Sequence, residues 1–148
     1  MEEKPKAIYI DRHPYEWKNF EVIHEYIERE QKVIETLEKR FKVDFFYNIM
    51  NIDEEQVLKQ KYSLMVTHLQ DDPEKKEFNY DKSISRIQSI HRLSPELKII
   101  VYTGAGIRAA ADSKLEQSGI SGVIRKRHIN DLEKDMEELN KYLDLLFS

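Results

Sequence analysis

The chain alternates short apolar runs with longer segments of helical periodicity, and this alternation restricts its fold more than any other feature. Five runs have the length and the β-branched or aromatic content of strands. They are Lys6–Asp11 (KAIYID), Lys42–Ile49 (KVDFFYNI), Tyr62–His68 (YSLMVTH), Leu97–Gly104 (LKIIVYTG) and Gly122–Lys126 (GVIRK). Because these runs are apolar over most of their length, we expect both faces of each strand to be covered, as in a parallel sheet.

The segment between the first two runs predicts a long helix, Glu16–Phe41. Its apolar residues share one helical face at spacings of three, four and seven: Phe20, Ile23, Ile27, Ile34, Leu37 and Phe41. A helix of this length would extend about 39 Å. Three arrangements fit: a break near Glu30 and Gln31, a projecting end on which Val33, Ile34 and Leu37 pair with another chain, or a long helix covering the edge of a tilted sheet.

Further helices follow each of the other strands. Asp53 and Gln56 have the spacing of a capping box, which predicts the start of a short helix. Ser83–Leu93 and Ala109–Leu115 are helical by pattern, and Asn130 with Glu133 predicts the start of the last helix. Five strand–helix units with right-handed crossovers predict one α/β domain over residues 1–148, an open parallel sheet with helices on both faces.

Composition excludes several classes of function. The chain has 148 residues, 35% of them charged, and a formal net charge of −4, which argues against a nucleic-acid partner. It has no cysteine, so disulfides and thiolate zinc sites are excluded. It also lacks an apolar run of membrane length and the apolar core of a signal peptide. We therefore expect a cytoplasmic protein without a membrane partner.

Polar residues end four of the five predicted strands. In an open α/β sheet, ligands bind beyond the carboxyl ends of the strands. The residues at these ends are Asp11, His68, Thr103 and Lys126. They are the candidate site residues.

The order of these residues resembles that of a response-regulator receiver domain. "IIVYTGA" resembles the fourth strand of that family, with its switch threonine at Thr103, and "SGVIRK" resembles the fifth, with its phosphate-pairing lysine at Lys126. "AIYID" resembles the first strand, where the family has two adjacent acids that hold magnesium. Here Asp11 is followed by Arg12. The resemblance implies a flavodoxin-like (βα)5 fold with strand order 2-1-3-4-5 and a role in two-component or phosphorelay signalling.

The third strand departs from the family pattern. His68 occupies the position of the aspartate that accepts a phosphoryl group in receivers. It could pack locally in a lost acceptor position, bind a metal, or accept a phosphoryl group on its ring; we favour local packing. Asp11 alone makes a poor magnesium site, because this ion prefers several oxygen ligands. The sequence thus predicts a pseudo-receiver, a non-catalytic module without magnesium or another cofactor, in which Lys126 pairs directly with Asp11.

Two alternatives remain open at this point. Asp71 or Asp72 could be a displaced phosphoacceptor in an otherwise functional receiver. Alternatively, "DRH" (11–13) and "SLM" (63–65) faintly resemble elements of cobalamin-binding domains, which would make the chain a flavodoxin-like cofactor-binding domain. The glycines that such domains require are missing.

The resemblance also implies protein partners, namely a histidine kinase, an output protein or a second copy of the chain. A homodimer could form through the first helix, or through the fourth helix, fifth strand and fifth helix. The second face would carry Arg108, Lys114, Glu116, Arg125 and the acidic start of the last helix. The basic run Arg125–His128 has two interpretations: an anion site beside Thr103, or surface charge that balances the acidic last helix.

Overall fold

The computed structural model of the protein describes residues 3–11, 20–47, 49, 52–69, 81–104 and 117–147. Its five strands form one parallel sheet in the order β2-β1-β3-β4-β5. The strands are β1 (Lys6–Ile10), β2 (Lys42–Phe46), β3 (Leu64–Thr67), β4 (Lys98–Thr103) and β5 (Gly122–Arg125). Each lies within its predicted run and is slightly shorter, and the predicted order 2-1-3-4-5 is confirmed.

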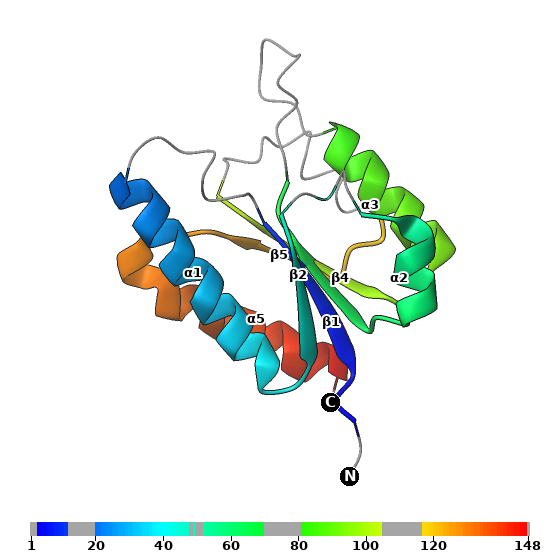
Figure 1. Ribbon diagram of the computed structural model, residues 1–148, viewed down its shortest axis with the longest axis horizontal. Helices are drawn as coiled ribbons and strands as arrows, with labels where there is room; N and C mark the ends of the chain where they lie inside the picture. Colours follow the sequence, from blue (N-terminus) through cyan, green and yellow to red (C-terminus); the bar gives the residue numbers. More distant parts are fainter. Residues whose placement is uncertain are drawn as a thin grey trace.

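Helices cover both faces of this sheet, as predicted. The helix α1 (Phe20–Glu38) and the last helix α5 (Leu132–Phe147) lie on one face, and α2 (Glu54–Gln60) and α3 (Asp81–Leu93) lie on the other (Figure 1). A short 3-10 helix, η3 (Ile129–Asp131), precedes α5. The predicted helix Ala109–Leu115 lies outside the described residues.

The core consists of two layers, one on each face of the sheet. In β1, Ala7 and Tyr9 pack towards α1 and α5, whereas Ile8 and Ile10 pack towards α2 and α3. This alternation follows from the period of two in a strand, and it requires apolar residues at consecutive positions. The apolar strand runs therefore indicated the two covered faces correctly.

Two of the three arrangements considered for the first helix are wrong, and α1 ends at Glu38 rather than at the predicted Phe41. It is continuous from Phe20 to Glu38, so the predicted break near Glu30 and Gln31 is wrong. Val33 and Leu37 are fully buried, so they cannot form a projecting surface for another chain.

The buried face of α1 is also rotated relative to the predicted stripe. Glu30 and Thr36 are buried, whereas Ile27 and Ile34 are only partly buried. The apolar pattern missed this phase because the helix contacts the rest of the domain through the polar residues Tyr26 and Arg29.

Of the two predicted helix caps, Asp53 is confirmed and Asn130 is wrong. At the start of α2, Asp53 Oδ1 accepts a hydrogen bond from the Glu55 amide at 3.0 Å, so Asp53 does cap the helix. Before α5, the cap is His128, whose Nδ1 accepts from the Asn130 amide at 3.2 Å. Asn130 was predicted as the cap, but it lies inside η3 because the chain makes a 3-10 turn before α5 begins.

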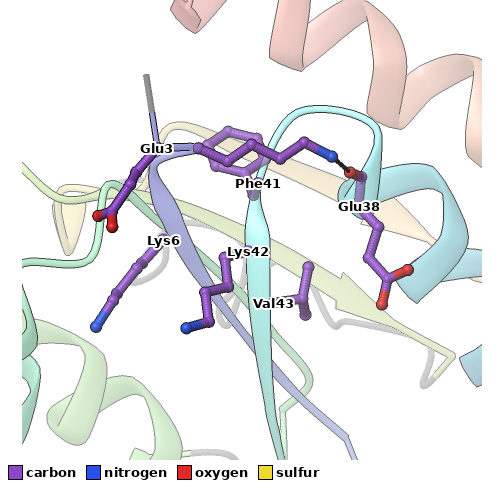
Figure 2. Close-up of a pocket in the computed structure, with 7 residues that line it drawn as sticks. Glu3, Lys6, Glu38, Phe41, Lys42 and Val43 are labelled. Carbon is purple, nitrogen blue, oxygen red and sulfur yellow. Dashed lines mark hydrogen bonds between the residues drawn. The ribbon is translucent and has the colours of Figure 1, made fainter. Parts of the chain in front are cut away.

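The two ends of the sheet have different surroundings. At the amino ends of β1 and β2, a cavity of about 540 Å³ is lined by charged side chains (Figure 2). The predicted site residues lie at the opposite, carboxyl end. None of the described helices is long and apolar enough to cross a membrane.

Candidate functional site

Asp11 and His68 are fixed at the carboxyl edge of the sheet by its own hydrogen-bond ladder. The Asp11 amide donates to the Phe46 carbonyl at 3.0 Å, and the His68 amide donates to the Ile10 carbonyl at 3.1 Å. Each bond continues the pairing of the adjacent strands by one residue. The two side chains therefore leave the sheet from positions that the strand register determines.

The centre of the site is a buried ion pair between Asp11 and Lys126. Lys126 Nζ lies 2.9 Å from Asp11 Oδ2 and 3.1 Å from Oδ1, and Asp11 is only 1% exposed. The hydroxyl of Tyr9 donates to Oδ2 at 2.8 Å, and the hydroxyl of Tyr26 donates to Oδ1. The predicted pairing of Lys126 with Asp11 is confirmed, and two tyrosines complete it.

This environment keeps Asp11 ionised. Burial raises the pKa of the Asp11 carboxyl, but the positive charge of Lys126 and the imidazole of His68 lower it, as do hydrogen bonds from Tyr26 and Lys126. The net result is a pKa below the ordinary value. Conversely, burial and the neighbouring Asp11 carboxylate raise the pKa of Tyr9, so its hydroxyl remains a donor.

His68 and Thr103 complete the predicted cluster. His68 is buried, and its Nδ1 lies 3.9 Å from Asp11 Oδ1, close enough for attraction when the imidazole is protonated. The buried Thr103 accepts a hydrogen bond from the Lys126 amide at its carbonyl oxygen, at 2.8 Å. The structure thus brings these predicted residues together, while Arg12, Asp71 and Asp72 lie outside the described residues.

Two aromatic rings face the ammonium group of Lys126. Its Nζ lies 5.4 Å from the ring centroid of Tyr26 and 5.2 Å from that of Tyr102. These distances permit cation–π attraction, which is stronger where water is excluded. The lysine is therefore held by a carboxylate and by two rings.

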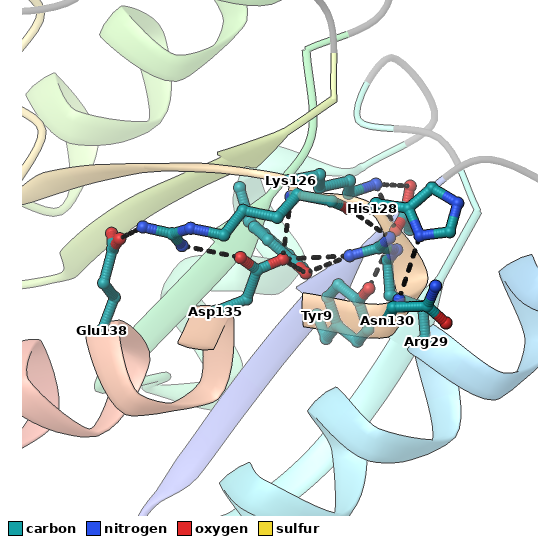
Figure 3. A network of polar contacts seen from close by, with 10 residues as sticks. Tyr9, Arg29, Lys126, His128, Asn130, Asp135 and Glu138 are labelled. Atoms are coloured by element: carbon teal, nitrogen blue, oxygen red, sulfur yellow. Dashed lines mark hydrogen bonds and ion pairs between the residues drawn. The ribbon is translucent and has the colours of Figure 1, made fainter. Parts of the chain in front are cut away.

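A second polar cluster, centred on Asp135, adjoins the first on the side of α1 and α5 (Figure 3). Asp135 is fully buried in the first turn of α5. Its Oδ2 accepts from Tyr102 Oη at 2.6 Å and from Arg29 Nη1 at 3.0 Å, and its Oδ1 accepts from Arg127 Nη1 at 2.7 Å. Arg127 also pairs with Glu138. This cluster joins α1, β4, the segment after β5 and α5.

The contacts of Arg127 decide between the two interpretations of the basic run. Its guanidinium bonds to two carboxylates of α5, Asp135 and Glu138. The interpretation as charge that balances the acidic last helix is therefore confirmed for Arg127. Lys126 likewise forms an ion pair, with Asp11.

Glu30 is a third buried acid at this site. It is 8% exposed, lies one turn after Tyr26 on α1, and its Oε1 has no hydrogen-bond partner among the described residues. Burial raises the pKa of Glu30 to about 7; the negative charge of Asp11 adds to the rise and Lys126 partly offsets it. The Glu30 carboxyl is therefore harder to ionise than that of an ordinary glutamate.

The donor set at this edge does not fit a magnesium ion. Magnesium prefers several hard oxygen ligands in octahedral geometry. Here both oxygens of Asp11 accept from Lys126, and the residue that follows β3 is His68, whose side chain is an imidazole. Within the described part of the chain, no three acidic or histidine side chains are grouped as metal ligands. The ammonium group of Lys126 provides the positive charge next to Asp11.

Several residues of these clusters were not predicted from the sequence. Tyr9 lies two residues before Asp11, on the same face of the strand, so a period of two would have identified it. Tyr26, Arg29 and Glu30 continue the line of Val33 and Leu37 at helical spacing. Asp135 lies within the apolar stripe of α5, where a buried acid signals a partner.

Comparisons with known proteins identify the fold. No protein-family model matches the chain, and no curated protein matches it. Among solved structures, the isolated REC domain of RcsB from Salmonella enterica serovar Typhimurium matches with a TM-score of 0.58 and 22% identity, over 98% of this chain and 99% of that one. The signal receiver domain of an HD domain-containing protein from Pseudomonas fluorescens Pf-5 matches with a TM-score of 0.60 and 15% identity, over 97% of each chain.

A third match is the BeF3-activated receiver domain of DrrB, a Thermotoga maritima protein, with a TM-score of 0.54 and 13% identity over 95% of this chain and 98% of that one. The chain spans 61% of a longer RcsB response-regulator chain. The protein therefore has the fold of response-regulator receiver domains. The predicted flavodoxin-like (βα)5 architecture is confirmed.

The ion pair predicts an order of stability among variants. We expect Asp11→Ala to lower the free energy of unfolding by about 3–5 kcal/mol, because it leaves the ammonium of Lys126 without its carboxylate in a buried position. His68→Ala is expected to cost less, since it leaves no buried charge unpaired. Urea unfolding followed by circular dichroism measures both, with the exposed Glu133→Ala as a control. An equal or larger loss for His68→Ala would contradict the central place of the ion pair.

Glu30 predicts a pH dependence of stability with a defined sign. Because its pKa is raised on folding from 4.5 to about 7, the native state binds its proton more tightly than the unfolded state does. Its contribution to stability is complete below pH 4.5 and is lost as the pH rises to about 7. As the pH rises between these values, the free energy of unfolding of Glu30→Gln should therefore increase by about 1–3 kcal/mol relative to that of the wild type.

The measurement is urea unfolding of both proteins at a series of pH values. The matched control is Glu35→Gln, an exposed acid on the same helix, whose difference from the wild type should not change with pH. A constant difference for Glu30→Gln as well would show that Glu30 does not titrate near neutrality.

Proposed function

We propose that this chain is a non-catalytic signal-transduction module of the receiver type, which acts through protein contact without phosphorylation at the end of β3. The observation that carries the proposal is the bonding of Lys126 to both oxygens of Asp11, next to a histidine at the acceptor position. In this proposal the chain forms a single domain, and its partner is a histidine kinase, an output protein or a second copy.

The chemistry of phosphoryl transfer supports this proposal. Transfer to a receiver requires a nucleophile and a divalent cation that neutralises the phosphoryl oxygens. The described strand ends provide one carboxylate, on Asp11, and it already has a lysine partner. A phosphoryl group entering this site would have to displace a buried ion pair and two tyrosine hydrogen bonds.

The polar clusters connect the site to the helices α1 and α5. Lys126 and Arg127 are consecutive, so the segment after β5 takes part in both clusters. Through Arg29 and Asp135, this segment is joined to α1 and α5.

The proposal predicts that phosphoryl donors do not modify the protein. Incubation with acetyl phosphate and magnesium should add no phosphoryl group, because no carboxylate occupies the end of β3. Intact-mass spectrometry measures this directly. The double variant His68→Asp, Arg12→Asp serves as the matched comparison, since it restores the acidic pattern of phosphorylatable receivers.

Peptide mapping separates the alternatives if the wild-type protein is modified. An adduct on Asp71 or Asp72 would establish a displaced acceptor, and an adduct on His68 would establish phosphorylation of the imidazole. Either outcome would overturn the proposal. Modification of the double variant alone would support it, because it would tie the loss of phosphorylation to these two positions.

A further inference from the structure

The cavity at the amino ends of β1 and β2 is separate from the site at the carboxyl edge. It has a volume of about 540 Å³, within the range of small-molecule sites. Its lining residues are Glu3, Lys4, Lys6, Glu38, Phe41, Lys42 and Val43 (Figure 2). Five of the seven lining residues are charged, and Phe41 and Val43 add apolar surface beside them.

None of the three lysines of this cavity donates a hydrogen bond to an acidic side chain among the described residues. Lys4 Nζ donates to the backbone carbonyl of Glu38 at 2.7 Å, and Lys6 Nζ donates to Gln60 Oε1 at 2.8 Å. Both acceptors are uncharged. Lys42 is exposed and forms no ion pair within the described part of the chain.

Lys6 and Lys42 are also placed side by side by the sheet. They are direct partners in the β1–β2 register, so their side chains leave the same face. Like charges directly opposite each other in a sheet are destabilising. A bound anion would remove this repulsion, and nothing in the packing of the core requires a lysine at either position.

The same edge of the sheet collects further cations, although the whole chain has a net charge of −4. Parallel strands begin at one edge, and the helices that precede them end there. Among the described residues outside the cavity, Lys39, Lys59, Lys61, Arg92 and Lys98 lie near this edge, and Arg40 there is paired with Asp144 of α5. Cations near helix ends have a partial explanation in the helix dipole. Lys6, Lys42 and Lys98 begin strands, so the dipole does not account for them.

We propose that this cavity binds a small anion that carries two or more phosphate groups. The ammonium groups of Lys6 and Lys42, on one face of the sheet, match two phosphate groups, and lysine binds phosphate as a point charge. Glu3 and Glu38 also line the cavity, and their carboxylates disfavour a large polyanion that would cover the whole edge. The shared chemistry is a pyrophosphate group, either inorganic or within a nucleoside diphosphate. This inference does not depend on the proposed signalling function.

The test is calorimetric titration of the full chain with inorganic pyrophosphate and with a nucleoside diphosphate, at constant ionic strength. We expect binding of pyrophosphate that the double variant Lys6→Gln, Lys42→Gln weakens by about tenfold or more. The matched control is Lys134→Gln, Lys141→Gln, which removes two exposed lysines of α5 and should leave the affinity unchanged. Circular dichroism verifies that both variants are folded.

The outcomes separate the possible ligands. Tighter binding of the nucleoside diphosphate than of pyrophosphate would identify a nucleotide as the ligand, and equal binding would identify the phosphate chain alone. Absence of binding by both would overturn the inference. An equal loss of affinity in the two double variants would also overturn it, because binding would then reflect net charge and not this cavity.

Discussion

The buried ion pair between Asp11 and Lys126 determines how the carboxyl edge of the sheet is organised. It joins the end of the first strand to the residue after the fifth, so both ends of the chain contribute to it. Burial of a charged pair costs hydration free energy, and such a pair is tolerated when further hydrogen bonds complete it. Tyr9 and Tyr26 provide these bonds to Asp11, and the rings of Tyr26 and Tyr102 face Lys126.

The arrangement of α1 follows from this constraint. Its second half is anchored by Val33 and Leu37, which are fully buried in the core. Nearer its start, Tyr26 bonds to Asp11, and Arg29 bonds to Tyr102 and Asp135. The helix is therefore held by apolar contacts in its second half and by polar contacts around Tyr26 and Arg29.

The sequence predicted those features that depend on strand patterns and strand ends. The five apolar runs indicated the parallel sheet, and the residues that end them indicated Asp11, His68 and Lys126. The polar part of the site was predictable only in part: helical spacing places Glu30 and Asp135 on the buried faces of their helices, but it does not identify the groups that they contact. Asp135 accepts a hydrogen bond from Arg29, which lies 106 residues away in sequence. Contacts of that range are set by the packing of helices and leave no local pattern.

Magnesium titration tests most directly whether Lys126 has taken the place of a bound cation. Thermal unfolding is compared with and without millimolar magnesium chloride, at ionic strength matched with sodium chloride, for the wild type and for Asp11→Ala. A ligand raises the melting temperature only if it binds the native state. Our account predicts the same melting temperature with and without magnesium. A magnesium-dependent rise in the wild type that Asp11→Ala abolishes would contradict it, because the metal site would then have survived.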